Sequence, residues 1–136
     1  MPDSSPRALF AARLLQARQL RGLSQRALGD RMGLGKDKGS SRINRYEHQV
    51  TAIGFDNLGA LAQVLDVPVS YLLADDAAMA DAILALSQAD EGQRDALAAL
   101  IPALVQEPAL LSRLVKLLQL PKREQSKALK ALVQED

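Results

Sequence analysis

Basic and hydrogen-bonding side chains gather in one short part of this sequence, residues 18–48. Eight Lys or Arg residues stand there against three Asp or Glu residues, a net charge of +5 in a chain whose total net charge is +1. Lys and Arg neutralise phosphates, so this focus is the electrostatic pattern expected of a protein that binds a polyanion. Charge alone fits a solvated helix face equally well, and the surrounding elements must decide between the two.

The residue types of an enzyme active site are scarce. The chain has one His, no Cys and no cluster of carboxylates, so neither a metal centre nor a nucleophilic site is expected. It also has no phosphate-binding glycine loop of the P-loop type. His48 is expected to lie at a helix end or to face a phosphate. The sequence therefore predicts a protein that is not an enzyme and uses no cofactor.

Composition predicts a globular protein of the cytoplasm. Of the 136 residues, 48% are hydrophobic and 24% are charged, which is typical of folded chains and not of disordered ones. The absence of Cys fits a reducing compartment. No signal peptide is evident at the N-terminus, and no apolar run approaches the ~18 residues that span a bilayer. We expect no contact with a membrane.

Five short helices are predicted in the first 74 residues, at about 6–20, 25–32, 41–48, 55–65 and 71–73, because apolar residues recur there at helical spacing. Gly22 is expected to end the first helix, and Ser24 to cap the second. Ser40 or Ser41 should cap the third, and Ser70 the fifth. A glycine inside the second helix, at position 29, either permits a close helix approach or is only tolerated.

The second half of the chain also reads as helix, at about 77–87, 91–106, from Pro108 and from Pro121. Pro102 should kink or break the second of these helices. All four aromatic residues lie at or before Tyr71, and residues 74–136 carry a net charge of −3. This change of composition predicts an all-α protein with a domain at 1–74 and a helical segment at 75–136.

Three short motifs follow one another at a characteristic spacing: Gly22-Leu23-Ser24-Gln25, Met32-Gly33-Leu34 and Ile43-Asn44-Arg45-Tyr46-Glu47. Between residues 14 and 73 the chain thereby resembles the helix-turn-helix domain of the lambda-repressor/Cro-like regulators, the Xre family. The resemblance implies a five-helix domain whose third helix enters the DNA major groove. It therefore implies a protein of the nucleoid.

The resemblance also assigns roles to individual residues. It implies an ion pair between Arg18 and Glu47, which would join the first helix to the third. Base readout is implied for Ser40, Ser41, Arg42 and Arg45. A contact to a DNA phosphate is implied for Gln25. Phosphate contacts are also expected for Arg26, Lys36, Lys38, Asn44 and His48, with a solvated loop as the alternative for Lys36 and Lys38.

The chain departs from the family pattern in one stretch. Nine residues, 34–42, separate Gly33 from Ile43, about four more than is usual, which as helix would add about one turn or 5.4 Å. The extra residues either lengthen the recognition helix or form a basic loop between Gly35 and Gly39. Gln49 also replaces a glycine that is common after the third motif, and Ile53 replaces a common proline.

These features together predict a sequence-specific regulator of transcription that binds double-stranded DNA, with repression as the expected activity. A domain this small covers one half-site, so a homodimer on a palindromic operator is expected. The segment 75–136 would dimerise the chain or pack on its own N-terminal domain. Two alternatives are an antitoxin that represses its own operon, and a protein–protein adaptor that has lost DNA binding. The operator and any small-molecule effector are not encoded in a readable pattern.

Overall fold

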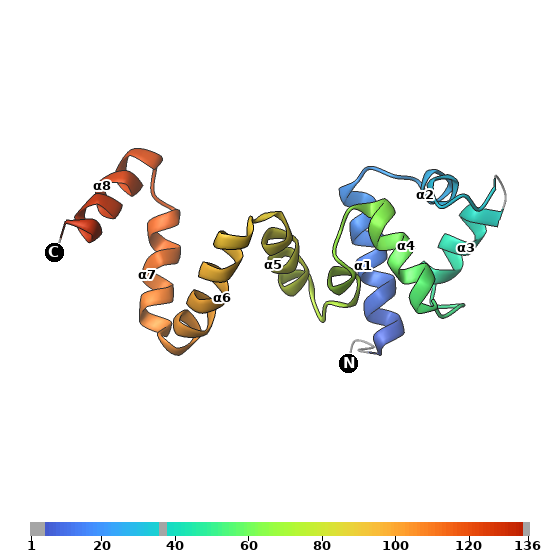
Figure 1. Ribbon diagram of the computed structural model, residues 1–136, viewed down its shortest axis with the longest axis horizontal. Helices are drawn as coiled ribbons and strands as arrows, with labels where there is room; N and C mark the ends of the chain where they lie inside the picture. The colour runs from blue at the N-terminus through green and yellow to red at the C-terminus, as the bar shows by residue number, and fades with distance from the viewer. Residues whose placement is uncertain (1–4, 36–37, 135–136) are drawn as a thin grey trace. The chain divides into compact units, whose positions relative to one another are not determined.

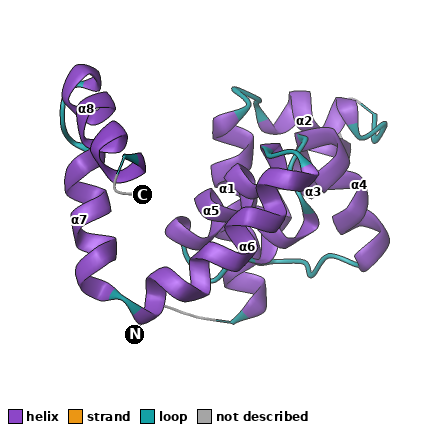
Figure 2. Cartoon of the chain, turned by 60° about the vertical axis from the view of Figure 1, so that its left-hand side comes forward, coloured by secondary structure: helices purple, strands orange, loops and turns teal. Residues whose placement is uncertain are grey.

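The computed structural model describes residues 5–35 and 38–134, and every regular element within them is a helix (Figures 1 and 2). The predicted all-α class is confirmed. In chain order the elements are α1 (Pro6–Leu20), α2 (Gln25–Arg31), α3 (Lys38–Glu47), α4 (Phe55–Leu65), the 3-10 helix η1 (Val69–Leu73), α5 (Ala77–Gln88), α6 (Glu91–Gln106), α7 (Pro108–Leu118) and α8 (Lys122–Val133).

The chain divides into two compact units, Met1–Ala89 (unit 1) and Asp90–Asp136 (unit 2). Unit 1 therefore extends beyond the boundary expected near residue 74, because α5 belongs to it. Ala80 of α5 is completely buried in the core of unit 1, and the Asp81 carboxylate accepts a hydrogen bond of 3.3 Å from Gln16 of α1. Burial, and secondarily the charge of Asp81, raise the pKa of the Tyr71 phenol above its usual value.

The core of unit 1 is built on the inner face of α1, where Phe10, Leu14 and Ala17 recur at helical spacing and are at most 3% exposed. The ring of Phe10 meets that of Tyr46 from α3 edge to face, with centroids 6.0 Å apart. The other fully buried side chains of more than methyl size come from the remaining elements of the unit: Leu28, Ile43, Leu61, Leu65, Tyr71 and Leu72.

Left-handed residues follow helices α1, α2 and α3. Gly22 and Gly33 have φ angles of 65° and 72°, and each follows the last turn of a helix. Gln49 adopts a φ of 61° after α3, in the place where the family commonly has glycine. Its amide donates to the Tyr46 carbonyl and the next amide, that of Val50, to the Arg45 carbonyl, which satisfies the end of the helix.

The predicted caps of the third and fifth helices were wrong. Helix α3 begins at Lys38, so Ser40 and Ser41 lie inside it and do not cap it. Pro68 precedes η1, which contains Ser70 as a helical residue. Of the two alternatives for Pro102, the break is excluded, because helix α6 runs through this residue. The Ser24 prediction is confirmed, since its hydroxyl accepts a hydrogen bond from the Ala27 amide at 3.0 Å.

Helices α2 and α3 cross glycine on glycine. A methyl carbon built on Gly29 would lie 2.5 Å from the carbonyl carbon of Gly39, and one built on Gly39 would lie 2.7 Å from the Cα of Gly29. Both residues are buried. Only glycine fits at either position, so Gly29 permits a close approach, the first of the two alternatives that the sequence left open.

Unit 2 consists of α6, α7 and α8. Asp90 begins it with a complete capping box, in which the Asp90 carboxylate and the Gln93 side chain each bind the other's backbone amide. None of the residues of α6 and α7, all of which the structure describes, is buried. Within the described chain no single helix has the length and hydropathy of a membrane span; α6 and α7 together do, but they are bent by 116°.

The glycine crossing predicts a specific cost for added bulk. We expect Gly39→Ala to lower the free energy of unfolding by about 1–3 kcal/mol, because the new methyl group overlaps the backbone of α2. Gly59→Ala is the matched control, since a methyl group there meets nothing within 4 Å. Within α4 it should stabilise the protein by about 0.5–1 kcal/mol. Urea unfolding followed by circular dichroism measures both. Equal effects of the two variants would contradict the close crossing.

Candidate nucleic-acid interface

Helix α3 has one buried and one exposed face. Ile43 and Tyr46 are 0% and 4% exposed and fix the inner face in the core. Positions i, i+3, i+4 and i+7 from Lys38 share the outer face of a helix, and they are exposed here: Lys38, Ser41, Arg42 and Arg45. The structure therefore brings three of the predicted base-reading residues and one predicted phosphate contact onto a single face.

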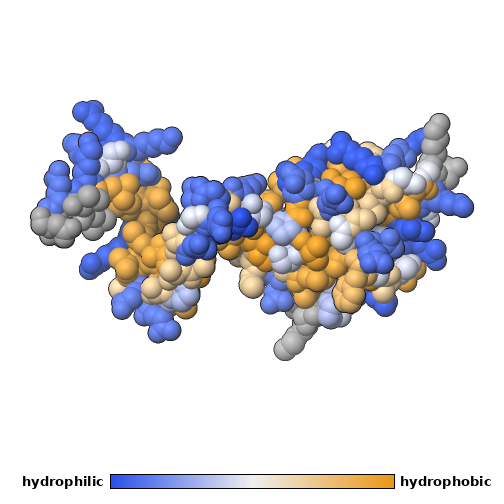
Figure 3. All heavy atoms as spheres, in the orientation of Figure 1, coloured by the Kyte–Doolittle hydropathy of each residue, from blue (hydrophilic) through white to orange (hydrophobic). Residues whose placement is uncertain are grey.

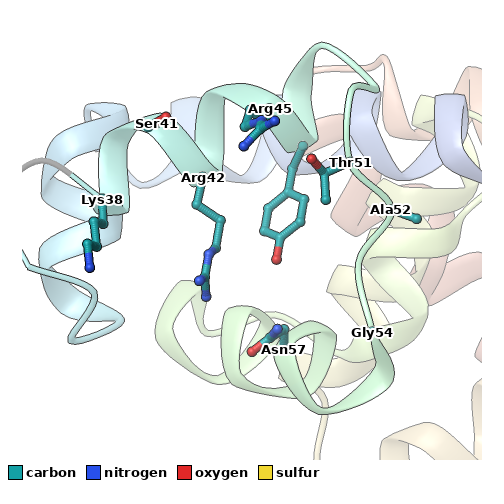
Figure 4. A pocket seen from close by; sticks show the side chains of 9 residues that line it. Lys38, Ser41, Arg42, Arg45, Thr51, Ala52, Gly54 and Asn57 are labelled. Atoms are coloured by element: carbon teal, nitrogen blue, oxygen red, sulfur yellow. The ribbon is translucent and has the colours of Figure 1, made fainter.

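This face forms one wall of an open groove of about 590 Å³. The segment that follows α3 and the first turn of α4 line the groove as well, through Thr51, Ala52, Gly54 and Asn57. Figure 4 shows the Arg42 side chain extending from α3 toward α4, with Asn57 on the other side of the space. Among the described residues that line it, three are basic and none is acidic, so the groove is suited to an anion.

The predicted ion pair between Arg18 and Glu47 is present and is bidentate. The two nitrogen–oxygen distances are 2.6 Å from Arg18 Nε to Glu47 Oε1 and 3.2 Å from Nη2 to Oε2. The side chains are 16% and 5% exposed, so solvent screens the pair little. Arg18 also donates to the Leu23 carbonyl at 2.9 Å. The pair therefore holds α1, the segment before α2 and the end of α3 together.

Gln25 extends this network to the first turn of α2. Its amide Nε2 donates to Glu47 Oε2 at 2.7 Å, and its Oε1 accepts a longer hydrogen bond of 3.5 Å from Asn44 Nδ2. Both ends of the Gln25 side chain are thus engaged within the protein. The contacts that the structure shows for Gln25 and Asn44 position α3 against α2, beside whatever role either has toward DNA.

The remaining predicted site residues do not all join the groove. Ser40 is half-buried, and its amide lies at the glycine crossing, on the α2 side of α3. Arg26 is exposed on α2, and His48 is exposed with Nδ1 2.9 Å from the Asn44 carbonyl oxygen. Lys36 lies outside the described residues. The insert is divided, because Lys38 and Gly39 join the helix whereas Gly35, with a φ of 77°, stays in the turn.

Sequence reasoning missed the far wall of the groove. Thr51 and Asn57 lie in the segment after α3 and the first turn of α4, and no periodicity marks either of them. The available signal was the position of Asn57, a short polar side chain in the first turn of a predicted helix that follows the recognition helix.

Comparison with family profiles matches residues 14–72 to the family described as helix-turn-helix. The matched span contains α2, α3 and the groove, and it covers most of unit 1. A solved structure described as the crystal structure of transcriptional regulator BswR aligns with 71% of this chain and 95% of its own. The two are 31% identical, with a TM-score of 0.63. The chain belongs to the lambda-repressor-like helix-turn-helix family. Comparison with curated proteins gave no match.

Membership of this family makes the helix-turn-helix protein a DNA-binding regulator. It also gives the outer face of α3 a meaning, since the third helix of such domains is the one that enters the major groove. In this chain that helix is α3, whose exposed polar face lines the basic groove.

The ion pair predicts a large effect on stability. Glu47→Ala leaves the Arg18 guanidinium nearly buried and unpaired, so we expect a loss of about 2–4 kcal/mol in the free energy of unfolding. Asp56→Ala, at an exposed position of α4, is the control and should change it by less than about 0.5 kcal/mol. The double variant Arg18→Met/Glu47→Leu should lose less than Glu47→Ala alone, because no charge is left unpaired. Denaturant unfolding of the three variants tests the pair, and a neutral Glu47→Ala would contradict it.

Proposed function

We propose that this helix-turn-helix protein is a repressor of transcription that binds a palindromic operator as a homodimer. The observation that carries the proposal is the outer face of α3, on which Ser41, Arg42 and Arg45 project beside a basic groove. Arg is the natural bidentate partner of a guanine edge, and Ser accepts or donates to several bases. These three residues are therefore the proposed base readers, and Ser40, which is half-buried, stands at the edge of the set.

Phosphate contacts would orient the domain on the duplex. Lys38 lies at the first position of α3 and lines the groove, so we assign it to a phosphate. Arg26 is exposed in the first turn of α2, next to Gln25, which bonds to Glu47 and Asn44. His48 is exposed just after the end of α3. Gln25, Lys36 and Asn44 complete the proposed phosphate set.

Unit 2 is the proposed dimerisation element. One domain of this size contacts one half-site, and a two-fold dimer on a palindrome joins two such weak contacts. Neither α6 nor α7 has a buried residue, although both helices are rich in Leu, Ile and Val. Helices of that composition gain stability only by burying those side chains against another surface.

Selection from a randomised pool of double-stranded DNA tests the function directly. At about 150 mM salt, non-specific attraction to phosphates is strongly reduced. Enrichment of a palindrome is the expected outcome, and the spacing of its half-sites would report the geometry of the dimer. Failure to enrich any sequence would favour the adaptor alternative, in which the fold does not bind DNA.

The individual base contacts can be tested on the selected site. Arg45→Ala should weaken binding by about 1–3 kcal/mol and relax the preference at one base pair of each half-site. Lys38→Ala should weaken binding to selected and random DNA alike and lower the slope of log K against log salt. Arg31→Ala, exposed at the other end of α2, is the control. Equal losses for Arg45→Ala on both DNAs would make Arg45 a phosphate contact.

Truncation tests unit 2. A chain ending at Ala89 keeps all the buried residues of unit 1, so it should stay folded, become a monomer and bind the palindrome about 100-fold more weakly. A chain ending at Ala74 should be less stable, because it loses Ala80 of α5 from the core. Sedimentation equilibrium and fluorescence anisotropy measure mass and affinity. A dimeric 1–89 fragment with unchanged affinity would exclude unit 2 as the dimerisation element.

A further inference from the structure

Unit 2 exposes an unusual amount of apolar surface. In its described residues, ten large apolar side chains are between 37% and 69% exposed: Leu97, Leu100, Ile101, Val105, Leu110, Leu111, Val115, Leu118, Leu120 and Leu129. Figure 3 shows part of this surface in orange over α7. Within the unit, α6 packs on α7 and α7 packs on α8, and these contacts leave the apolar side chains largely uncovered.

The charges of unit 2 are sorted along the chain. Residues 90–107 carry four carboxylates, those of Asp90, Glu91, Asp95 and Glu107, against one base, Arg94. Residues 113–130 carry one carboxylate, that of Glu124, against six bases: Arg113, Lys116, Lys122, Arg123, Lys127 and Lys130. All twelve of these charged groups are exposed. The small net charge of this half of the chain therefore conceals an acidic segment and a basic one.

The two segments each present their charge in order on a helix. Glu91 and Asp95 are four residues apart and share a face in the first turns of α6. Arg123, Lys127 and Lys130 follow one another at i, i+4 and i+7 on α8. Helix α6 also exposes four large apolar side chains, and α8 exposes that of Leu129. A partner of unit 2 must therefore present apolar surface to its exposed Leu, Ile and Val side chains. It must also present acidic groups to α8 and basic groups to α6.

A second copy of unit 2 has that chemistry. We propose that two copies associate through unit 2 in an isologous interface, in which the acidic start of α6 in one copy faces the basic surface of α7 and α8 in the other. Two-fold symmetry makes the same contact twice. The exposed Leu, Ile and Val side chains fill the space between the charged ends. This inference rests on the homodimer proposed above and specifies how its subunits recognise each other.

A nucleic acid or an anionic lipid surface fits unit 2 less well. Either would attract the basic helices α7 and α8, and a basic amphipathic helix is a known membrane-surface pattern. Either would also repel the acidic start of α6 and would leave much of its apolar stripe in water. Only a partner that carries both signs of charge matches the whole surface, and this chain carries both signs in the required order.

Charge reversal tests the pairing in the full-length protein without DNA. The acid-reversed variant is Glu91→Lys/Asp95→Lys, which leaves the capping residue Asp90 intact. The base-reversed variant is Arg123→Glu/Lys127→Glu, in the first half of α8. The helix dipole favours the change at position 123, which lies in the first turn. Arg7→Glu/Arg31→Glu, at exposed positions of unit 1, is the control with the same change of net charge as the base-reversed variant. Sedimentation equilibrium gives the dissociation constant of each dimer.

We expect each reversed variant to dimerise about tenfold or more weakly than the unaltered chain, and the control to dimerise normally. An equimolar mixture of the two reversed variants should form a heterodimer tighter than either homodimer. In that heterodimer one contact has the original acidic α6 and basic α8, and the other has a basic α6 and an acidic α8, so both contacts join opposite charges. A chain that carries all four reversals should recover the original dissociation constant. These recoveries exclude misfolding as the cause of the weakening.

Other outcomes would overturn the inference. Unchanged dimerisation of both reversed variants, with palindromic DNA still bound, would leave the regulator function in place and reject only the charge pairing. A monomeric unaltered chain would reject both the dimer and the pairing. Binding of the unaltered chain to vesicles of anionic and zwitterionic phospholipid, lost in the base-reversed variant while its dimer is unchanged, would assign α7 and α8 to a lipid surface. The same result with random DNA would assign them to phosphates.

Discussion

The carboxylate of Glu47 joins three helices of unit 1, and the position of the recognition helix depends on it. Glu47 lies at the end of α3. Its carboxylate accepts two hydrogen bonds from Arg18 of α1 and a third from Gln25 of α2. At 5% exposure it has little water to compete for these bonds. Such a carboxylate is costly to bury alone and strongly held once paired, so the three helices are most stable in the one arrangement that satisfies it.

The other end of α3 is held by shape and not by charge. Gly29 and Gly39 let the backbones of α2 and α3 meet at a distance that any side chain would prevent. Because both ends of α3 are held, the direction of its axis is fixed. The buried side chains of Ile43 and Tyr46 fix the rotation of the helix about that axis. The outer face is thereby set without any residue of that face taking part. The proposed base readers Ser41, Arg42 and Arg45 all lie on that face.

Much of this arrangement could be predicted from the sequence, because it rests on local periods and fixed spacings. The helix ends at Gly22 and Ser24 and the buried stripe of α1 follow from residues whose roles are set within a few turns of chain. The Arg18–Glu47 pair joins residues on different helices, and it was implied by the family resemblance. The start of α3 was missed because the interlock of Gly29 and Gly39 is a tertiary contact. The end of unit 1 was missed for a related reason: Ala80 looks like any other alanine until η1 and α1 are in place around it. Asn57 reaches the groove only through the path of the segment after α3, which has no periodicity to read.

In the proposed function, the two units solve different parts of one physical problem. A recognition face of three side chains and a few phosphate contacts supplies sequence preference but little affinity, and its electrostatic share falls as salt rises. Tethering two such faces makes the second half-site contact intramolecular, which adds avidity without adding any contact to DNA. That gain requires a dimer that does not itself compete for the DNA. In the proposed dimer, unit 2 meets this requirement, because its basic helices face carboxylates of the partner and are not left open to phosphates.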